Sequence, residues 1–174
     1  AMWLMNGSTV LGGGYLGTVP VAWSISGAGD FNGDGKADLV WTNTVTGERA
    51  MWFMNGSTMI GGAALSTVPV AWTISGVGDF NADGKADIVL SNTVTGDRVI
   101  WLMDGSTITT NAFLGTVPVA WTISSVGDFD GDGKADLVWT NTATGDRAMW
   151  LMNGGTLSGG GYMGTVPTVW KINY

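Results

Sequence analysis

The stretch Gly29–Trp41, GDFNGDGKADLVW, occurs three times in this sequence at one fixed spacing. It returns as GDFNADGKADIVL from Gly78 and as GDFDGDGKADLVW from Gly127, a step of 49 residues each time. A repeat of that length is typical of proteins in which one supersecondary unit is used several times. Within the stretch, oxygen-bearing side chains alternate around an Asp-Gly turn, which is how a chain wraps a hard cation.

The composition favours short strands over helices or disorder. Of the 174 residues, 45% are hydrophobic, 29 are glycine and only 12% are charged, which is typical of strands joined by glycine-rich turns. There is no cysteine, so no disulfide framework stabilises the fold. No segment keeps a helical period, and none is long and apolar enough to span a bilayer.

The second copy of the repeat shows the expected strands most clearly. We expect strands at Trp72–Gly78, Asp87–Asn92 and Arg98–Met103, because each is apolar and bounded by turn residues. A turn at 104–106 then leads into a looser fourth segment through Leu114. Four short antiparallel strands in a repeat of this length are typical of a β-propeller blade. The predicted fold is therefore an all-β propeller of four-stranded antiparallel blades, with about 3.5 repeats in this chain.

The repeat also predicts the organisation of the chain as a single repeat domain. It divides into a partial blade holding a third and a fourth strand, three full blades, and the end of a further first strand: 1–22, 23–71, 72–120, 121–169 and 170–174. A sequence that starts at Ala1 is expected to be a processed or excised product. Three arrangements are open: closure as four blades, a ring of seven or eight blades from two chains, or a piece of a longer array. The edges near Ala1 and Tyr174 need partners, so we expect a homo-oligomer or a continuation of the array.

Tryptophan recurs at two equivalent positions of every repeat. One series is Trp23, Trp72, Trp121 and Trp170, and the other is Trp3, Trp52, Trp101 and Trp150. A residue type that recurs at blade-equivalent positions forms a packing layer between neighbours. Packing is therefore the expected role, and stacking on a sugar is the alternative.

Each repeated loop predicts a calcium site. Carboxylate or amide oxygens stand at positions 1, 3, 5 and 9, while the lysine at position 7 offers only its backbone carbonyl. All-oxygen sets suit Ca²⁺, and zinc is disfavoured without His or Cys. We expect about three ions per chain, bound by Asp30, Asn32, Asp34, Lys36 and Asp38; by Asp79, Asn81, Asp83, Lys85 and Asp87; and by Asp128, Asp130, Asp132, Lys134 and Asp136.

The acidity of the chain has the same origin. The loops hold ten of the 14 acidic residues, so the formal net charge of −7 reads as metal-ligand charge. Three divalent ions would leave the chain almost neutral. The negative charge also disfavours nucleic acids and anionic membranes as partners.

The sequence resembles the FG-GAP/VCBS repeats of bacterial surface proteins, integrin α-subunit propellers and some propeller lectins. GDFNGDGKADLVW, the following TNTVTGER and AMWFMNG carry the resemblance, which covers essentially the whole chain. It implies a β-propeller with Ca²⁺ in the loop between the first two strands of each blade. It also implies an extracellular or cell-surface setting, here bacterial, and a role in adhesion or ligand binding.

An enzyme is not expected, because the chain has no His or Cys and its acids mostly serve the loops. Arg49, Arg98 and Arg147 each follow an acid, and we expect turn chemistry and surface ion pairs there. Two functions are open. One is an extracellular module that binds a ligand, with carbohydrate as the candidate ligand. The other is a structural or self-assembly unit of a larger surface protein, ring or filament.

Overall fold

The computed structural model describes residues 1–170 and has fourteen strands, with no helix in that range. A two-stranded hairpin comes first, formed by β1 (Met2–Asn6) and β2 (Thr9–Gly14). Three four-stranded antiparallel sheets follow, each with its strands in sequence order, and we call them the first, second and third blades. They hold β3 (Trp23–Gly29), β4 (Asp38–Asn43), β5 (Arg49–Asn55) and β6 (Thr58–Ala64); β7 (Trp72–Gly78), β8 (Asp87–Asn92), β9 (Asp97–Asp104) and β10 (Thr107–Thr116); and β11 (Trp121–Gly127), β12 (Asp136–Asn141), β13 (Asp146–Asn153) and β14 (Thr156–Thr165).

The predicted all-β repeat of four antiparallel strands is confirmed. β7 and β8 have the predicted bounds. β7 starts after the turn at Pro69 and ends at Gly78, and β8 is bounded by Asp87 and Asn92. The expectation of a loose fourth segment is wrong. Residues 107–116 form a regular strand of ten residues, in which two register shifts absorb the extra length against β9. Residues 171–174, the end of the expected further first strand, lie outside the described residues.

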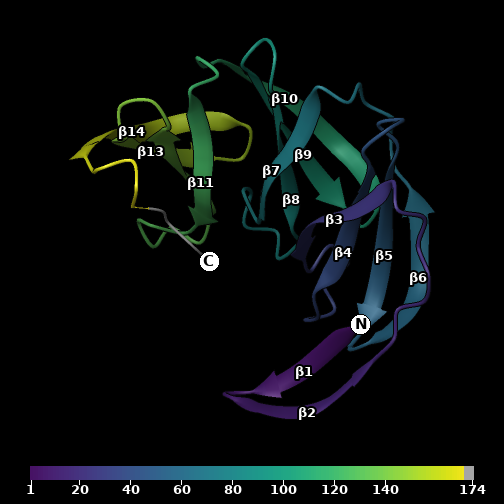
Figure 1. Ribbon diagram of the computed structural model, residues 1–174. Coiled ribbons are helices and arrows are strands. Elements are labelled where there is room, and N and C mark those ends of the chain that lie inside the picture. The colour runs from purple at the N-terminus through teal and green to yellow at the C-terminus, as the bar shows by residue number, and fades with distance from the viewer. Residues whose placement is uncertain (171–174) are drawn as a thin grey trace.

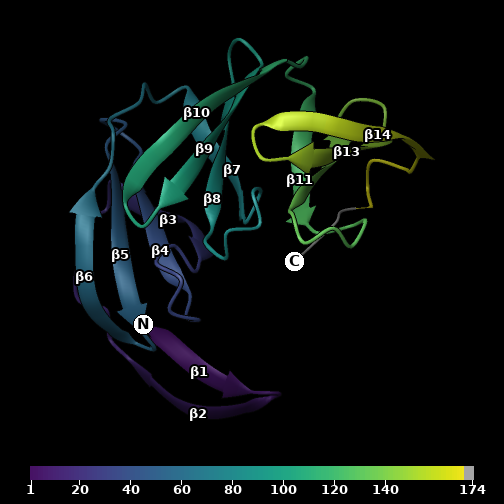
Figure 2. The same cartoon turned by 180° about the vertical axis from the view of Figure 1, so that it is seen from behind.

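The blades follow one another along an open arc (Figure 1). The hairpin β1–β2 lies at one end of the arc and the third blade at the other, and the view from behind shows the same order (Figure 2). The first strands β3, β7 and β11 line the inner side and contact one another in turn. The outer side carries the fourth strands, so every blade is oriented in the same way within the arc.

A glycine allows the inner strands to approach closely. A Cβ atom added at Gly76 would lie 2.4 Å from Cγ2 of Val126 in the third blade. The same contact recurs one interface earlier, where a Cβ at Gly27 would lie 2.6 Å from Cγ2 of Val77. Packing between neighbouring first strands therefore depends on a glycine in one strand and a valine in the next.

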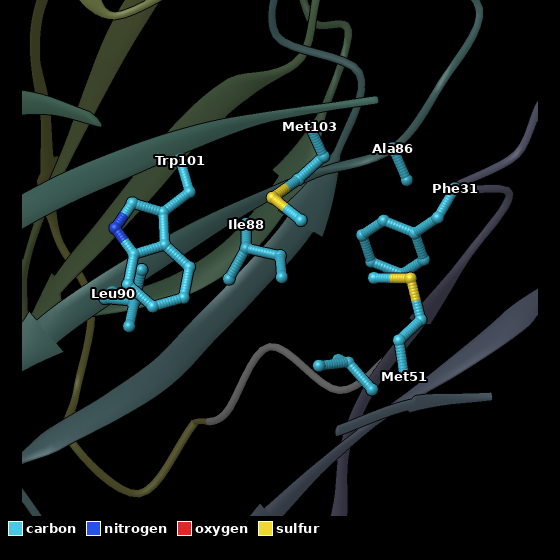
Figure 3. Close-up of a cluster of buried hydrophobic side chains, with 8 residues drawn as sticks. Phe31, Met51, Ala86, Ile88, Leu90, Trp101 and Met103 are labelled. Carbon is cyan, nitrogen blue, oxygen red and sulfur yellow. The ribbon is translucent and has the colours of Figure 1, made fainter. Parts of the chain in front are cut away.

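Neighbouring blades share hydrophobic cores. Between the first and second blades, Phe31 and Met51 pack against Ile88, Trp101 and Met103, and all five are buried (Figure 3). A corresponding cluster joins the second blade to the third, and a smaller one joins the hairpin to the first blade. The cores thus lie between blades, as in other repeat proteins whose units cannot bury their faces alone.

The tryptophans mostly pack, as the sequence predicts. Trp101 is buried, and Trp72 and Trp121 are half-buried against the inter-blade cores. Trp41 and Trp139 are buried too, at the position that Leu90 occupies in the second blade. Trp3 and Trp170 are exposed. Trp3 is in the hairpin at one end of the arc, and Trp170 follows the third blade at the other.

The expected surface ion pairs of the TGER and TGDR turns are wrong. Arg49, Arg98 and Arg147 are buried, and none forms a salt bridge within residues 1–170. Instead, Nη2 of Arg98 donates to the carbonyl of Trp121, 2.8 Å away in the next blade, and its guanidinium lies over the ring of Trp139. Burial lowers the pKa of the Arg98 guanidinium. Arg49 and Arg98 thus clasp their blades to the tryptophan that starts the next first strand, and Arg147 makes the equivalent bond to the carbonyl of Trp170.

We expect Arg98→Ala to lower the free energy of unfolding by about 2–4 kcal/mol, because it removes a charge-assisted hydrogen bond and buried packing together. Urea denaturation followed by tryptophan fluorescence measures the loss. Arg98→Lys is the matched control, since it keeps the charge without the planar fork and should lose less. If Arg98→Ala changed the free energy of unfolding by less than about 0.5 kcal/mol, the contact of Arg98 with the next blade would not stabilise the fold.

Candidate functional site

The three acidic loops join the first and second strands of each blade and share one backbone geometry. In the first loop, Oδ1 of Asp30 accepts the N–H of Gly33 at 2.7 Å, and Oδ2 accepts the N–H of Gly35 at 2.6 Å. Asp128 makes the same two bonds to Gly131 and Gly133 in the third loop. The first aspartate therefore winds the loop around its own carboxylate and places the later side chains on the same side.

The aspartates at position 5 lie in exposed or half-exposed surroundings. Asp34 and Asp132 each pair with the lysine two residues later, at 3.3 and 2.9 Å. The pairing lowers the pKa of Asp132 and raises that of Lys134. In the second loop the lysine turns away, because Lys85 pairs with Asp104 on β9. Exposed pairs of this kind contribute about 0–1 kcal/mol, so a divalent cation can displace them.

The aspartates at position 9 are buried and have two backbone partners each. Oδ2 of Asp87 accepts the N–H of Phe80 at 2.9 Å, and Oδ1 accepts the N–H of Met103 at 2.8 Å. Asp38 and Asp136 make the corresponding bonds in the other blades. This residue therefore ties the start of the loop to the end of the third strand, a role that the spacing of the motif did not show.

Burial raises the pKa of Asp87 to about 6, against the opposite effect of its two N–H donors. The neighbouring charges of Asp83 and Asp79 raise it further. The ionised form of this carboxyl group is disfavoured, because it is buried and two other carboxylates lie nearby with no cation to balance them. A divalent ion between these groups would favour the ionised form.

The third loop brings three of the predicted ligands together. Carboxylate oxygens of Asp128, Asp130 and Asp136 all lie within 4.8 Å of one another, which suits one cation. Asp132 is not in this set, because both of its oxygens bond Lys134. In the first two loops position 3 is an asparagine, and Oδ1 of Asn32 and of Asn81 accepts the N–H of the residue at position 5. The all-oxygen donors fit calcium, and Lys36, Lys85 and Lys134 remain predicted ligands through their carbonyls.

A second feature, which the sequence did not reveal, is a polar pocket between neighbouring blades. Between the second and third blades it has a volume of about 140 Å³, and a pocket of the same size lies one repeat later. Their linings correspond at 49-residue spacing: Thr73, Ser75, Ser91, Asn92, Thr93, Arg98, Val119 and Trp121 in one, and Thr122, Ser124, Thr140, Asn141, Thr142, Arg147, Thr168 and Trp170 in the other.

The polar pocket combines an aromatic wall with hydrogen-bonding groups. The hydroxyls of Ser75 and Ser91 lie 2.6 Å apart, and a Thr140–Ser124 pair at 3.0 Å takes their place in the next pocket. The clasping arginine lines the same space, and Nε of Arg98 has no hydrogen-bond partner among the described residues. Only the repeat register could have exposed these sites in the sequence. The first pocket combines side chains of two blades, and the second combines the third blade with Thr168 and Trp170, which follow β14.

A different pair of pockets is mainly apolar. Trp72, Leu90 and Trp101 line one of about 190 Å³, whose wall is completed by Val68, Val99 and Asn111. Trp23, Trp41 and Trp52 line its counterpart of about 240 Å³ at the preceding interface. These spaces adjoin the hydrophobic cores and offer few polar groups, so they are gaps in the packing between blades.

Within the described residues, no helix is long and apolar enough to cross a membrane. No curated protein and no solved structure matches the chain significantly. Family models do match: a model of the FG-GAP-like repeat covers residues 30–90 and 79–139, and one of the FG-GAP repeat covers residues 120–159. These repeats are typical of extracellular or surface proteins and generally serve as non-enzymatic modules. Because the matched segments together run from residue 30 to residue 159, well over half of the chain and into all three blades, the chain belongs to the FG-GAP repeat family.

Proposed function

We propose that this chain is a calcium-stabilised, extracellular propeller module that binds carbohydrate at the polar pockets between its blades. The observation that carries the proposal is the recurrence of one pocket, with the same aromatic, hydroxyl and arginine groups, one repeat apart: once between the second and third blades, and once between the third blade and Trp170. A bacterial surface is the setting that fits a non-enzymatic binding module of this family. Adhesion follows from two equivalent sites on one arc, because linked sites bind a repeated glycan with avidity.

Calcium is the cation that the loops fit. Each loop offers only oxygen donors on a turn that its first aspartate already holds closed. In the third loop three carboxylates converge, and one of them, that of Asp136 at position 9, is buried. Mg²⁺ demands a smaller and stricter octahedron than a loop with five or more oxygen donors provides.

We expect calcium to raise the unfolding temperature. At a free concentration about 100 times Kd, one bound ion adds about 2.7 kcal/mol, or roughly 5–10 °C for a chain of this size. Thermal unfolding in calcium, in magnesium and in EDTA measures the effect. Relative to the midpoint in EDTA, we expect magnesium to raise the midpoint less than calcium does. Equal midpoints in calcium and EDTA would exclude a stabilising calcium site.

The polar pocket suits a sugar ring better than it suits an apolar ligand. Sugars present an apolar face to an aromatic side chain and hydroxyls to polar groups, and Trp121 faces a lining of Ser, Thr, Asn and Arg. The small volume limits each pocket to one terminal sugar unit. The arginine brings a positive charge to the wall of the pocket, so an acidic sugar is the favoured class.

A glycan array with the calcium-loaded chain tests carbohydrate binding, and hits rich in terminal acidic sugars are expected. We then expect the double variant Ser75→Ala and Ser124→Ala to weaken binding to the best hit roughly five- to tenfold, as the loss of a hydrogen bond implies. Asn111→Ala, which changes the apolar pocket, is the matched control and should bind as the parent does. An array without hits, or equal weakening by the control, would contradict the site.

A further inference from the structure

The interface between two blades has two different sides. The earlier blade contributes what we call its outgoing face, which is Phe31 and Met51 in the first blade. The later blade contributes its incoming face, which includes Trp101 and Met103 in the second blade. The same two faces meet again where Phe80 and Ile100 of the second blade pack against Leu137 and Met152 of the third.

The outgoing face of the third blade is open. Phe129 occupies the position of Phe31 and Phe80, yet its side chain is 46% exposed where theirs are 0% exposed. The backbone of this face is open as well. A Cβ atom at Gly14 would meet the side chain of Ser57 in the next blade, whereas a Cβ at the equivalent Gly161 would meet nothing within 4 Å.

The incoming face of the hairpin β1–β2 is open in the same way. Met5 is 49% exposed, whereas the equivalent Met54, Met103 and Met152 are at most 1% exposed. Trp3 is 72% exposed, whereas Trp101 at the same position is 6% exposed. The hairpin is therefore packed on one side only, against the first blade, through Met2.

A backbone hydrogen bond marks both interfaces between full blades. The N–H of Gly105 donates to the carbonyl of Phe31 at 3.0 Å, and the N–H of Gly154 donates to the carbonyl of Phe80 at 2.7 Å. The next pair in this series is the N–H of Gly7 and the carbonyl of Phe129. Gly7 lies in the turn between β1 and β2, and Phe129 follows β11. The hairpin and the third blade lie at opposite ends of the arc (Figure 1), so these two groups do not meet within the arc.

We propose that the open outgoing face of one chain binds the open incoming face of a second copy, so that two arcs close head to tail into one ring. The occupant is a second copy because the hairpin supplies the same Trp, Met and Gly positions that fill this face twice within the chain. A head-to-tail contact repeated by a two-fold rotation leaves no free face. The proposal is independent of any carbohydrate or calcium binding.

The interface between copies is smaller than those within the chain. The hairpin supplies the third- and fourth-strand positions of an incoming face but no second strand, where Ile88 and Leu90 stand in the second blade. We therefore expect a dimer that dissociates on dilution. Light scattering over a concentration series should give a mass rising toward twice the 18.1 kDa of one chain. A mass of one chain at every concentration would overturn the proposal.

Cysteine cross-linking tests the geometry, and the chain has no native cysteine to interfere. We expect a disulfide between Ser8→Cys on one copy and Gly161→Cys on another when the two single variants are mixed and oxidised. Gly14→Cys with Ser57→Cys in one chain is the internal control, because those positions face each other across a completed interface. A mixture that stays uncross-linked while the control closes would overturn the head-to-tail arrangement.

Charge placed on each face separates this arrangement from a symmetric contact. Phe129→Asp and Met5→Asp should each lower the dimer fraction at least tenfold, and mixing the two should restore dimers through the one intact interface of each pair. Val94→Asp alters an equally hydrophobic residue that is exposed on a turn, and it should dimerise as the parent does. Failure of the mixture to restore dimers, with both variants folded by circular dichroism, would contradict the proposal.

Discussion

Asp87→Ala should lower the free energy of unfolding by about 4 kcal/mol even when calcium is absent. The substitution leaves the N–H groups of Phe80 and Met103 without their acceptor. An unsatisfied buried donor costs about 1–3 kcal/mol, and two are left here. Chemical denaturation in EDTA measures this structural part of the effect without any contribution from bound metal.

Asp83→Ala is the matched comparison in the same loop. Asp83 is exposed, so its loss in EDTA should cost less than about 1 kcal/mol, since water can hydrate the groups it leaves. In calcium the two variants should both lose the stabilisation of the second loop. If Asp87→Ala and Asp83→Ala lowered the free energy of unfolding equally in EDTA, the carboxylate of Asp87 would have no structural role beyond binding a metal.

Gly96→Ala should cost at least about 3 kcal/mol, because two penalties coincide. The backbone of Gly96 has a φ of +84°, a conformation that strains a residue with a side chain by about 1–2 kcal/mol. A Cβ atom there would also lie 2.2 Å from the carbonyl oxygen of Val117. The clash involves backbone, and the N–H of Val117 donates to the carbonyl of Gly96 at 2.8 Å, so neither segment can move freely.

Gly84→Ala separates the two penalties. Gly84 has a φ of +83°, and a Cβ there would meet nothing within 4 Å, so only the strain of about 1–2 kcal/mol is expected. Both variants should be unfolded in urea with EDTA present, because Gly84 lies in a candidate metal loop. Equal losses in the two variants would show that the turn can shift away from Val117.

The sequence predicted the blades because each strand is bounded by residues with strong local preferences. Asp87 and Asn92 end β8 on both sides, so a local pattern was enough. Arg98 was misplaced because the acid beside it suggested an ion pair. Its real partner is a carbonyl 23 residues later, in another blade. A contact between repeats leaves no local mark, and only the register of the repeat connects the two positions.

The candidate site follows the same division. The spacing of Asp128, Asp130 and Asp136 predicted oxygens that the structure does bring together. It did not show that Asp136 is buried or that it holds Phe129 and Met152 through their N–H groups. The polar pockets were not predicted, because Ser75 and Trp121 belong to different blades and neither is unusual in its own strand.

The hydrogen bonds between blades have a consequence for how a gene of this kind can change length. The bond from Ala86 to Asp30 and the bond from Ala135 to Asp79 differ in position by the same 49 residues, as do the arginine clasps. Unequal recombination that adds or removes 49 codons, wherever its breakpoints fall, therefore joins donors to acceptors already matched to each other. Such a gene can gain or lose a repeat while every new junction between blades uses the same hydrogen bonds as the existing ones.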